Sequence, residues 1–508
     1  MHLNVKEYDV DDVLVEVGQW GRYQQKLFIY FNIQHLILGV VVMSIIFIGV
    51  EPSWKCGVEP VTVQDSPRRE SRSLLDTKDD DRCVMYEEQS CVVEVDQPYT
   101  SIVAEWDLYC SQFYKVALSQ SLFFFGMLLG AWFLGPLADK MGRRKVYFYT
   151  SLLFFSATFL TALSLNYIQF ALCRFLIGFC NAGCLSCIFV ILMEVIGPGY
   201  RAVMGIIYSG FFALCFPLLS IMVYIIPSWR ILTGVLSVAG FLHLTAFHYV
   251  PESPRWLLLK GHVEEALQVL QTLAVYNGTK VPPEVKLKKG EVTKQSTTSS
   301  SILDLFSFST IRTRTIVTMA CWFSVSITYY GLSLGADSLS DNLYVSCALM
   351  GLVEIPGQLV CCLIVDRYGR KMSLVLTLLL TGIACICSGV VQWISQYVAN
   401  TLVGTTMMLS LTGKFAVSTA FALLYVYTSE LFPTEVRNKG LGVSSVAARV
   451  GGILAPFVAS LNNWSLGLPL IVMGLVPLIS GLMSLLLPET KGKSLPDTLH
   501  ELRHTSRV

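Results

Sequence analysis

The stretch GPLADKMGRRK at residues 135–145 has a shorter copy, DRYGRK, at residues 366–371. Both copies place Asp three residues before Gly, and both follow that Gly with two basic residues. Each copy also stands between the second and third apolar runs of its half of the chain. This spacing predicts a protein built from two related halves.

A second pattern follows each copy. Glu194 precedes Arg201 by seven residues, and Glu430 precedes Arg437 by the same distance. Charges at neighbouring helix ends can pair in one conformation and separate in another. The alternative is that they serve only to orient the chain in a membrane. We expect a conformational latch formed by Asp139, Arg143, Glu194, Arg201, Asp366, Arg370, Glu430 and Arg437.

The composition places the chain in a membrane. Of its 508 residues, 53% are hydrophobic and 14% are charged, and the mean hydropathy is +0.58. Soluble globular chains carry about 25% charged residues, so a cytosolic enzyme is excluded. The net charge of +1 gives no indication of a nucleic-acid partner.

Continuous apolar runs predict an all-α polytopic protein, because a bilayer core about 30 Å thick needs roughly 20 apolar residues of helix. We expect twelve transmembrane helices in two six-helix halves. The domains are then a segment at 1–25, a bundle at 26–250 with a loop at 51–115, a central loop at 251–315, a bundle at 316–487 and a tail at 488–508. The runs fall near 27–50, 116–138, 146–165, 168–193, 203–226, 231–250, 316–336, 343–365, 373–394, 398–426, 441–461 and 466–487.

Basic residues indicate the orientation, because Lys and Arg collect in cytoplasmic loops. Clusters such as 140–145 and 367–371 fall on one side, which places both termini in the cytoplasm of a multi-pass plasma-membrane protein. The 51–115 loop then faces outward, with fourteen acidic against seven basic residues. An oxidising space favours disulfides. We expect two disulfides, in a pairing that the sequence leaves open, from Cys56, Cys83, Cys91 and Cys110.

The repeated motif resembles the signature loop of the major facilitator superfamily. Further stretches resemble solute carrier family 22, the organic cation, anion and zwitterion transporters: SIVAEWDLYC at 101–110, PESPRWL at 251–257 and PET at 488–490. The resemblance implies the major facilitator fold, with two six-helix halves that rock about a central site.

Three ionisable residues are expected near the membrane midplane: Arg449, Lys414 and Glu354. Arg449 lies roughly 12–14 Å along its span at 1.5 Å per residue. Its guanidinium could bind a carboxylate by two parallel hydrogen bonds. The alternative is that Glu354 neutralises Arg449. The sequence ARVG at 448–451 resembles the organic-anion branch, whereas Gln358 stands where several members of that branch have a basic residue.

Aromatic side chains are candidates for the rest of the site, namely Tyr329, Tyr330, Phe415 and Tyr425. We expect a secondary transporter of small amphipathic organic anions, monocarboxylate or urate-like, working as a uniporter or exchanger. The alternatives are an organic cation or carnitine-like zwitterion carrier that uses Glu354, and a non-transporting receptor or scaffold. No enzyme activity, cofactor or metal is expected. The expected partners are the substrate, an exchange anion and the lipid bilayer, without nucleic acid.

Overall fold

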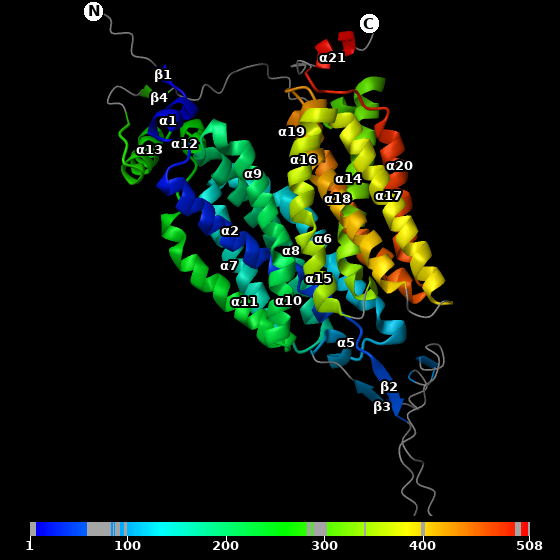
Figure 1. The fold of residues 1–508 in the computed structure, drawn as a ribbon. Coiled ribbons are helices and arrows are strands. Elements are labelled where there is room, and N and C mark those ends of the chain that lie inside the picture. Colours follow the sequence, from blue (N-terminus) through cyan, green and yellow to red (C-terminus); the bar gives the residue numbers. More distant parts are fainter. Residues whose placement is uncertain are drawn as a thin grey trace, which may run out of the picture.

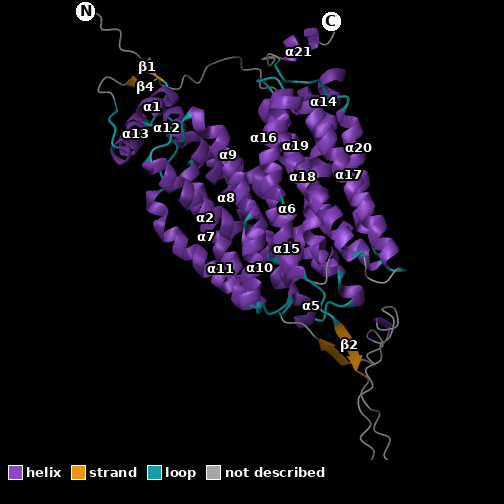
Figure 2. Cartoon of the chain, viewed as in Figure 1, coloured by secondary structure: helices purple, strands orange, loops and turns teal. Residues whose placement is uncertain are grey.

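The structure is a computed structural model of the chain. It describes residues 7–57, 83–84, 86, 92–95, 99–281, 286–287, 302–339, 342–397, 402–492 and 499–505. Long helices dominate, and two small pairs of strands lie outside the helical bundle (Figure 2).

The N-terminal half contains the six predicted spans. Two of them are divided, because α2 is followed by the single turn α3, and α9 continues as α10. The helices are α2 (Arg22–Met43), α3 (Ile45–Ile48), α6 (Tyr114–Met141), α7 (Arg143–Ala162), α8 (Tyr167–Val195), α9 (Pro198–Ala213), α10 (Cys215–Ile225) and α11 (Trp229–Leu244).

The C-terminal half repeats this arrangement, with its second span divided into α15 and α16. Among the described residues, ten helical segments are long and apolar enough to cross a membrane. The remaining two predicted spans correspond to α7 and the 17-residue α20. The helices are α14 (Ser309–Leu334), α15 (Leu343–Leu352), α16 (Glu354–Tyr368), α17 (Arg370–Ser395), α18 (Val403–Leu431), α19 (Arg437–Ala459) and α20 (Leu468–Ser484).

Short elements lie at the two ends of the bundle (Figure 1). One end carries α1 (Val10–Val17), α12 (Pro254–Leu259), α13 (Val263–Asn277) and α21 (Leu499–Thr505), together with β1 (Glu7–Tyr8), which pairs in parallel with β4 (Lys286–Leu287). The other end carries α5 (Ile102–Glu105) and the antiparallel pair β2 (Trp54–Gly57) and β3 (Val92–Val95). Short 3-10 helices are η1 (Cys110–Gln112), η2 (Thr245–Tyr249), η3 (Ile302–Phe306), η4 (Gly335–Leu339) and η5 (Ser460–Asn463).

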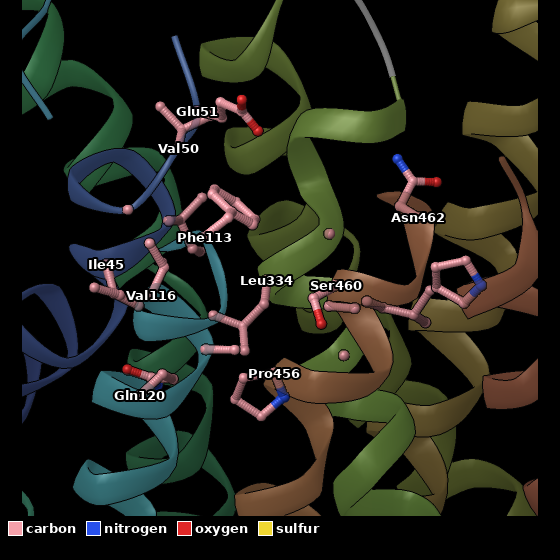
Figure 3. A pocket seen from close by; sticks show the side chains of 18 of the residues that line it. Ile45, Val50, Glu51, Phe113, Val116, Gln120, Leu334, Pro456, Ser460 and Asn462 are labelled. Carbon is pink, nitrogen blue, oxygen red and sulfur yellow. The ribbon is translucent and has the colours of Figure 1, made fainter. Parts of the chain in front are cut away.

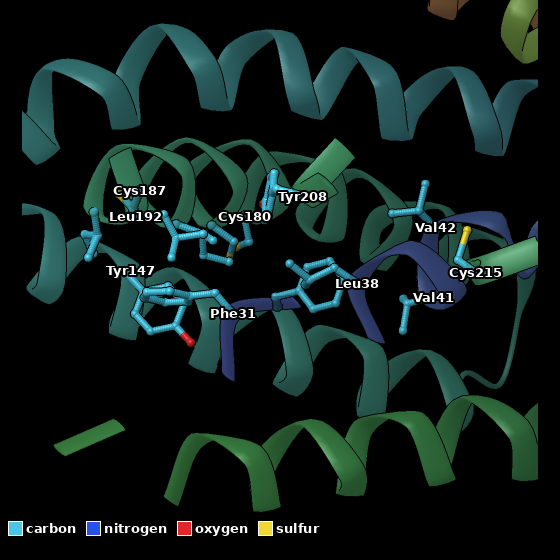
Figure 4. Close-up of a cluster of buried hydrophobic side chains, with 14 of the residues drawn as sticks. Phe31, Leu38, Val41, Val42, Tyr147, Cys180, Cys187, Leu192, Tyr208 and Cys215 are labelled. Atoms are coloured by element: carbon cyan, nitrogen blue, oxygen red, sulfur yellow. The ribbon is translucent and has the colours of Figure 1, made fainter. Parts of the chain in front are cut away.

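Each half has its own apolar core. In the N-terminal half, Phe31, Leu38 and Tyr147 pack with cysteines of α8 and α10 (Figure 4). These buried thiols behave as small apolar side chains. A methyl group on Gly178 would lie 1.9 Å from the Phe123 carbonyl oxygen, so α6 and α8 cross at backbone contact.

The halves meet through α6 with α19 and through α10 with α15. The Ser121 hydroxyl donates to the Ile453 carbonyl at 2.6 Å. A methyl group on Gly351 would lie 2.4 Å from the Ala213 carbonyl oxygen. Both α10 and α15 lie toward the β2–β3 end (Figure 1), so the contact between α10 and α15 holds the halves together on that side.

Residues 10–17 were expected to belong to a separate polar segment, yet they form a helix with a buried face. Val13, Leu14 and Val17 are fully buried, and α1 packs against α13. The Asn277 side chain donates to the Val17 carbonyl at 3.3 Å. The N-terminal segment and the central loop are therefore packed together at one end of the N-terminal half.

Candidate substrate site

Lys414, Glu354 and Tyr329 form a buried polar cluster in the C-terminal half. The Lys414 ammonium lies 3.0 Å from Glu354 Oε1 and donates to Ser333 Oγ at 2.6 Å. The Tyr329 hydroxyl donates to both Glu354 oxygens, at 2.9 and 3.0 Å. A buried charge is tolerated when it is paired and hydrogen-bonded. The cluster is thus a neutral connection between α14, α16 and α18.

Arg449 on α19 does not share this pair. Its side chain is partly buried, and its Nε is buried without a hydrogen-bond partner. Within the part of the chain that the structure describes, the guanidinium forms no salt bridge with Asp or Glu. Glu354, the partner considered as an alternative, pairs with Lys414 instead. Arg449 is therefore a cation without an opposing charge among these residues.

A group of aromatic rings lies within electrostatic range of Arg449. Its charge acts on the phenol groups of Tyr330 and Tyr425. The Tyr425 ring lies 4.6 Å from Trp322 and 5.8 Å from Phe421, centroid to centroid. From the N-terminal half, Phe124 lies 4.5 Å from Tyr330. The rings thus form one continuous group across α6, α14 and α18, and the charge of Arg449 on α19 acts on two of them.

Sequence reasoning missed Trp322 and Phe421. The available signal was helical spacing, because Trp322 precedes Tyr329 by seven residues and Phe421 precedes Tyr425 by four. Residues at these spacings share one face of a helix.

Two further candidates lie at contacts with neighbouring helices. The Phe415 carbonyl faces Gly357 of α16, since a methyl group on Gly357 would lie 3.0 Å from it. Gln358 faces α9 of the other half, because a methyl group on Gly210 would lie 3.4 Å from Gln358 Oε1.

The structure brings three of the expected latch residues together in the N-terminal half. Arg143 lies 3.1 Å from Asp139 and 4.0 Å from Glu194. Arg201, expected in the same cluster, pairs instead with Asp11 of α1 at 2.5 Å. Hydrogen bonding from Arg201, with a further contribution from Arg255, lowers the pKa of Asp11 to about 2.

In the C-terminal half, Arg370 lies 3.1 Å from Glu430. Arg437 does not join this pair in the described structure and donates to Thr434 Oγ1 at 3.2 Å. The Asp366 side chain lies outside the described residues.

Two glutamates that were not predicted as site residues bind the same helix ends. Glu252 accepts hydrogen bonds from the backbone amides of Arg143 and Arg144, at 3.0 and 3.1 Å. Glu489 accepts from the amides of Arg370 and Lys371, at 3.0 and 3.1 Å. A carboxylate at a helix N-terminus satisfies free N–H groups and favours the helix dipole. The internal repeat therefore extends to PES at 251–253 and PET at 488–490.

One disulfide joins Cys83 to Cys110, two of the four cysteines expected to pair. The side chain of Cys56 and the whole of Cys91 lie outside the described residues. Among the residues that are described, no group of three or more His, Cys, Asp or Glu could hold a metal ion.

Two related helical halves, each with the same charged motif at its helix ends, are typical of a membrane transport protein of the major facilitator type. The fold is similar to that of the xylose transporter XylE from E. coli in its partially occluded inward open conformation, with a TM-score of 0.65 and 16% sequence identity. This similarity covers 93% of this chain and 100% of that chain.

Residues 84–500 match the family described as "Sugar (and other) transporter". The chain is 36% identical to solute carrier family 22 member 15-like from Xenopus tropicalis, over 97% of this chain and 96% of that protein. It is 32% identical to organic cation/carnitine transporter 2 from Mus musculus, over 97% and 94%. The chain belongs to this transporter family and, within it, to solute carrier family 22, and is not an enzyme. The expected organic-anion branch is not the one that these relatives' names indicate.

Proposed function

We propose that the protein is a plasma-membrane secondary transporter that moves small organic zwitterions by alternating access, with both termini in the cytoplasm. The observation that carries this proposal is Arg449, a partly buried guanidinium without an acidic partner in the described chain, whose charge acts on the phenol groups of Tyr330 and Tyr425. A carnitine-like molecule has both groups that such a site can bind, a carboxylate and a quaternary ammonium.

Each substrate group has a physical counterpart in the site. Arg449 presents a planar donor fork that matches a carboxylate bidentately, and such pairs strengthen when water is excluded. A quaternary ammonium binds the faces of aromatic rings, which Tyr330 and Tyr425 supply. The similarity to organic cation/carnitine transporter 2 from Mus musculus supports this class of substrate.

Glu354 does not supply the counter-charge for the ammonium in this conformation. Its carboxylate is already bound by Lys414 and Tyr329, and the side chain is buried. In this proposal the aromatic rings therefore bind the cationic end of the substrate. A small organic anion is the second candidate, because the same Arg449 could bind a carboxylate that carries no ammonium.

In this proposal the latch residues control the change between the two conformations. Arg143 with Asp139 and Glu194, and Arg370 with Glu430, connect helix ends within each half. Pairs of this kind can open when the halves rock. The free energy of substrate binding would then be coupled to their rupture.

Uptake in cells expressing the chain tests the proposal with three probes: carnitine, tetraethylammonium and butyrate. We expect carnitine to be carried best, and Arg449→Gln to reduce its uptake roughly 10- to 100-fold, the cost of one charge-assisted pair. The matched control is Arg312→Gln, since Arg312 is exposed at the start of α14.

The other outcomes are decisive. Butyrate uptake without carnitine uptake would support the organic-anion candidate. Carnitine uptake that is unaffected by Arg449→Gln, at equal surface expression, would overturn the role of Arg449. Absence of flux for all three probes in proteoliposomes would favour a receptor or scaffold.

A further inference from the structure

Asp11 of α1 binds two arginines from different parts of the N-terminal half. Its carboxylate lies 2.5 Å from Arg201 of α9 and 2.5 Å from Arg255 of α12. Arg201 donates through both terminal nitrogens, at 3.1 and 2.5 Å, and this bidentate arrangement makes an arginine–carboxylate contact strong. Because α1 and α12 lie at the same end of the half (Figure 1), the terminal helix α1 is fastened to the start of α9.

Glu194, the expected partner of Arg201, is left incompletely bound. Its Oε2 atom is buried and has no hydrogen-bond partner among the described residues, and its other oxygen lies 4.0 Å from Arg143, beyond hydrogen-bonding distance. Arg201 nevertheless lies beside it, because Arg201 Nε donates to the carbonyls of Met193 and Ile196, at 2.7 and 2.9 Å. These two residues flank Glu194 at the end of α8. A buried acceptor without a donor is costly, so the Glu194 carboxylate is in place to receive the guanidinium.

In the C-terminal half the equivalent glutamate is satisfied. Glu430 accepts hydrogen bonds from Arg370 Nε at 3.1 Å and from Thr490 Oγ1 at 2.5 Å. It therefore needs no contact with Arg437, the equivalent of Arg201. The glutamate with an unused acceptor belongs to the half on which α1 is docked.

Arg201 stands at the start of a span that also joins the two halves. The first part of this span, α9, continues as α10, and α10 contacts α15 of the other half. In this contact the Cys347 thiol of α15 donates to the Phe216 carbonyl of α10 at 3.8 Å, and Cys347 is fully buried. A movement of Arg201 toward Glu194 would therefore displace the span that holds the halves together on this side.

The contact between α10 and α15 is a separate closure at the β2–β3 end. Beside it, a cavity of about 260 Å³ remains between the halves, and its lining includes α3 and α6 from the first half and α14, α19 and α20 from the second (Figure 3). The described residues that line this cavity include none from α10 or α15. The thiol of Cys347 therefore reports on the α10–α15 contact and not on the cavity.

We infer that Asp11 is a positioning residue of the N-terminal latch, and that α1 holds Arg201 away from Glu194 in the conformation in which α10 contacts α15. The inference rests on the alternating access of the proposed function and adds a control element to it. When α1 releases Arg201, the guanidinium binds Glu194, α9 shifts and the contact between α10 and α15 opens. The terminal helix thereby controls the equilibrium between the two conformations.

Modification of Cys347 from outside the cell tests the inference without a transported substrate. Intact cells expressing the chain are treated with a membrane-impermeant maleimide, and Cys347→Ser corrects for the exposed Cys362 and Cys387. We expect Asp11→Asn to raise the rate of Cys347 modification about fivefold, the shift that follows from the loss of a partly exposed charged pair. Asp11→Glu keeps the carboxylate and should restore the original rate.

A double variant distinguishes competition for Arg201 from simple loosening of α1. Asp11→Asn should raise the rate only where Glu194 can receive the guanidinium, so it should have no effect in a chain that also carries Glu194→Gln. The matched control is Glu16→Gln, an exposed position on α1, which should leave the rate unchanged. An equal increase with and without Glu194→Gln, or no increase in Asp11→Asn, would overturn the inference.

Carnitine uptake in the same cells distinguishes this inference from the proposed function. If carnitine is not transported but the rates of Cys347 modification change as expected, the proposed substrate fails and the positioning role of Asp11 stands. If carnitine uptake depends on Arg449 as expected but the Cys347 rates are equal in all variants, the positioning role of Asp11 fails alone.

Discussion

Lys414 and Glu354 form an ion pair of 3.0 Å in which both side chains are buried. The pair joins α18 to α16, and its two charges neutralise each other. In the proposed function, Arg449 is consequently the residue that selects the charge of a substrate. A buried pair of this kind is weak evidence for stability, but breaking it is costly because one charge remains uncompensated.

Replacement of Lys414 alone should destabilise the protein strongly. Lys414→Met leaves the Glu354 carboxylate buried without its cation, and we expect a loss of about 3–5 kcal/mol. The double variant Lys414→Met with Glu354→Gln should recover most of this loss. Thermal unfolding of the purified chain in detergent measures both effects. A single variant no less stable than the double variant would contradict the expectation.

Asp11 should hold α1 against the bundle independently of pH over the physiological range. Because the pKa of Asp11 is lowered to about 2, its stabilising effect is fully present above its ordinary value of 3.8 and is lost as the pH falls through about 2. Asp11→Asn should weaken this docking by about 1 kcal/mol, since the pair is partly exposed. Hydrogen exchange of residues 10–17 between pH 5 and 8 measures it.

The matched control is Glu16→Gln, an exposed position on the same helix. Asp11→Asn should speed exchange across α1, and Glu16→Gln should not. Equal acceleration by both variants would show that general charge, and not the contacts of Asp11 with Arg201 and Arg255, holds the helix.

The twelve spans could be predicted because a helix in lipid must satisfy its own backbone hydrogen bonds. A long apolar run therefore defines its structure locally. The breaks between α9 and α10 and between α15 and α16 were not predicted, although each run carries a proline in the first turn after its break, Pro217 in α10 and Pro356 in α16, and a proline inside an apolar run kinks the helix.

The charged residues of the site could be identified, but their partners could not. Arg201 pairs with Asp11, which lies 190 residues away in the sequence. Arg449, Lys414 and Glu354 were all expected at a similar depth, and it is Lys414 that pairs with Glu354. Depth along a span follows from the rise per residue, whereas the facing direction depends on how the helices pack. Trp322 and Phe421 were missed for the same reason.

Gly178 should not tolerate a side chain. A methyl group there would lie 1.9 Å from the Phe123 carbonyl oxygen, so Gly178→Ala must push α8 away from α6. We expect a loss of about 1–3 kcal/mol from overpacking, measured as a lower thermal midpoint and a smaller monodisperse fraction in size-exclusion chromatography. Gly234→Ala is the matched control, because nothing lies within 4 Å of a methyl group there. An unchanged midpoint for Gly178→Ala would refute the close crossing.

Glu489 should stabilise the start of α17 through its charge. Burial opposes its ionisation, but the backbone amides of Lys491, Arg370, Lys371 and Thr490 together lower the pKa of Glu489. The stabilisation is therefore present above its ordinary value of 4.5 and is lost as the pH falls below that value.

Glu489→Gln keeps an acceptor oxygen but removes the charge at the helix N-terminus, which is worth about 0.3–1 kcal/mol. We expect a lower thermal midpoint at pH 7, and a difference from the unmodified chain that shrinks as the pH is lowered below 4.5. Glu252→Gln, at the equivalent place in the other half, should lower the midpoint similarly, and the two losses should add because the sites lie in separate halves. A difference that persists undiminished in acid would mean that Glu489 acts through its shape and not through its charge.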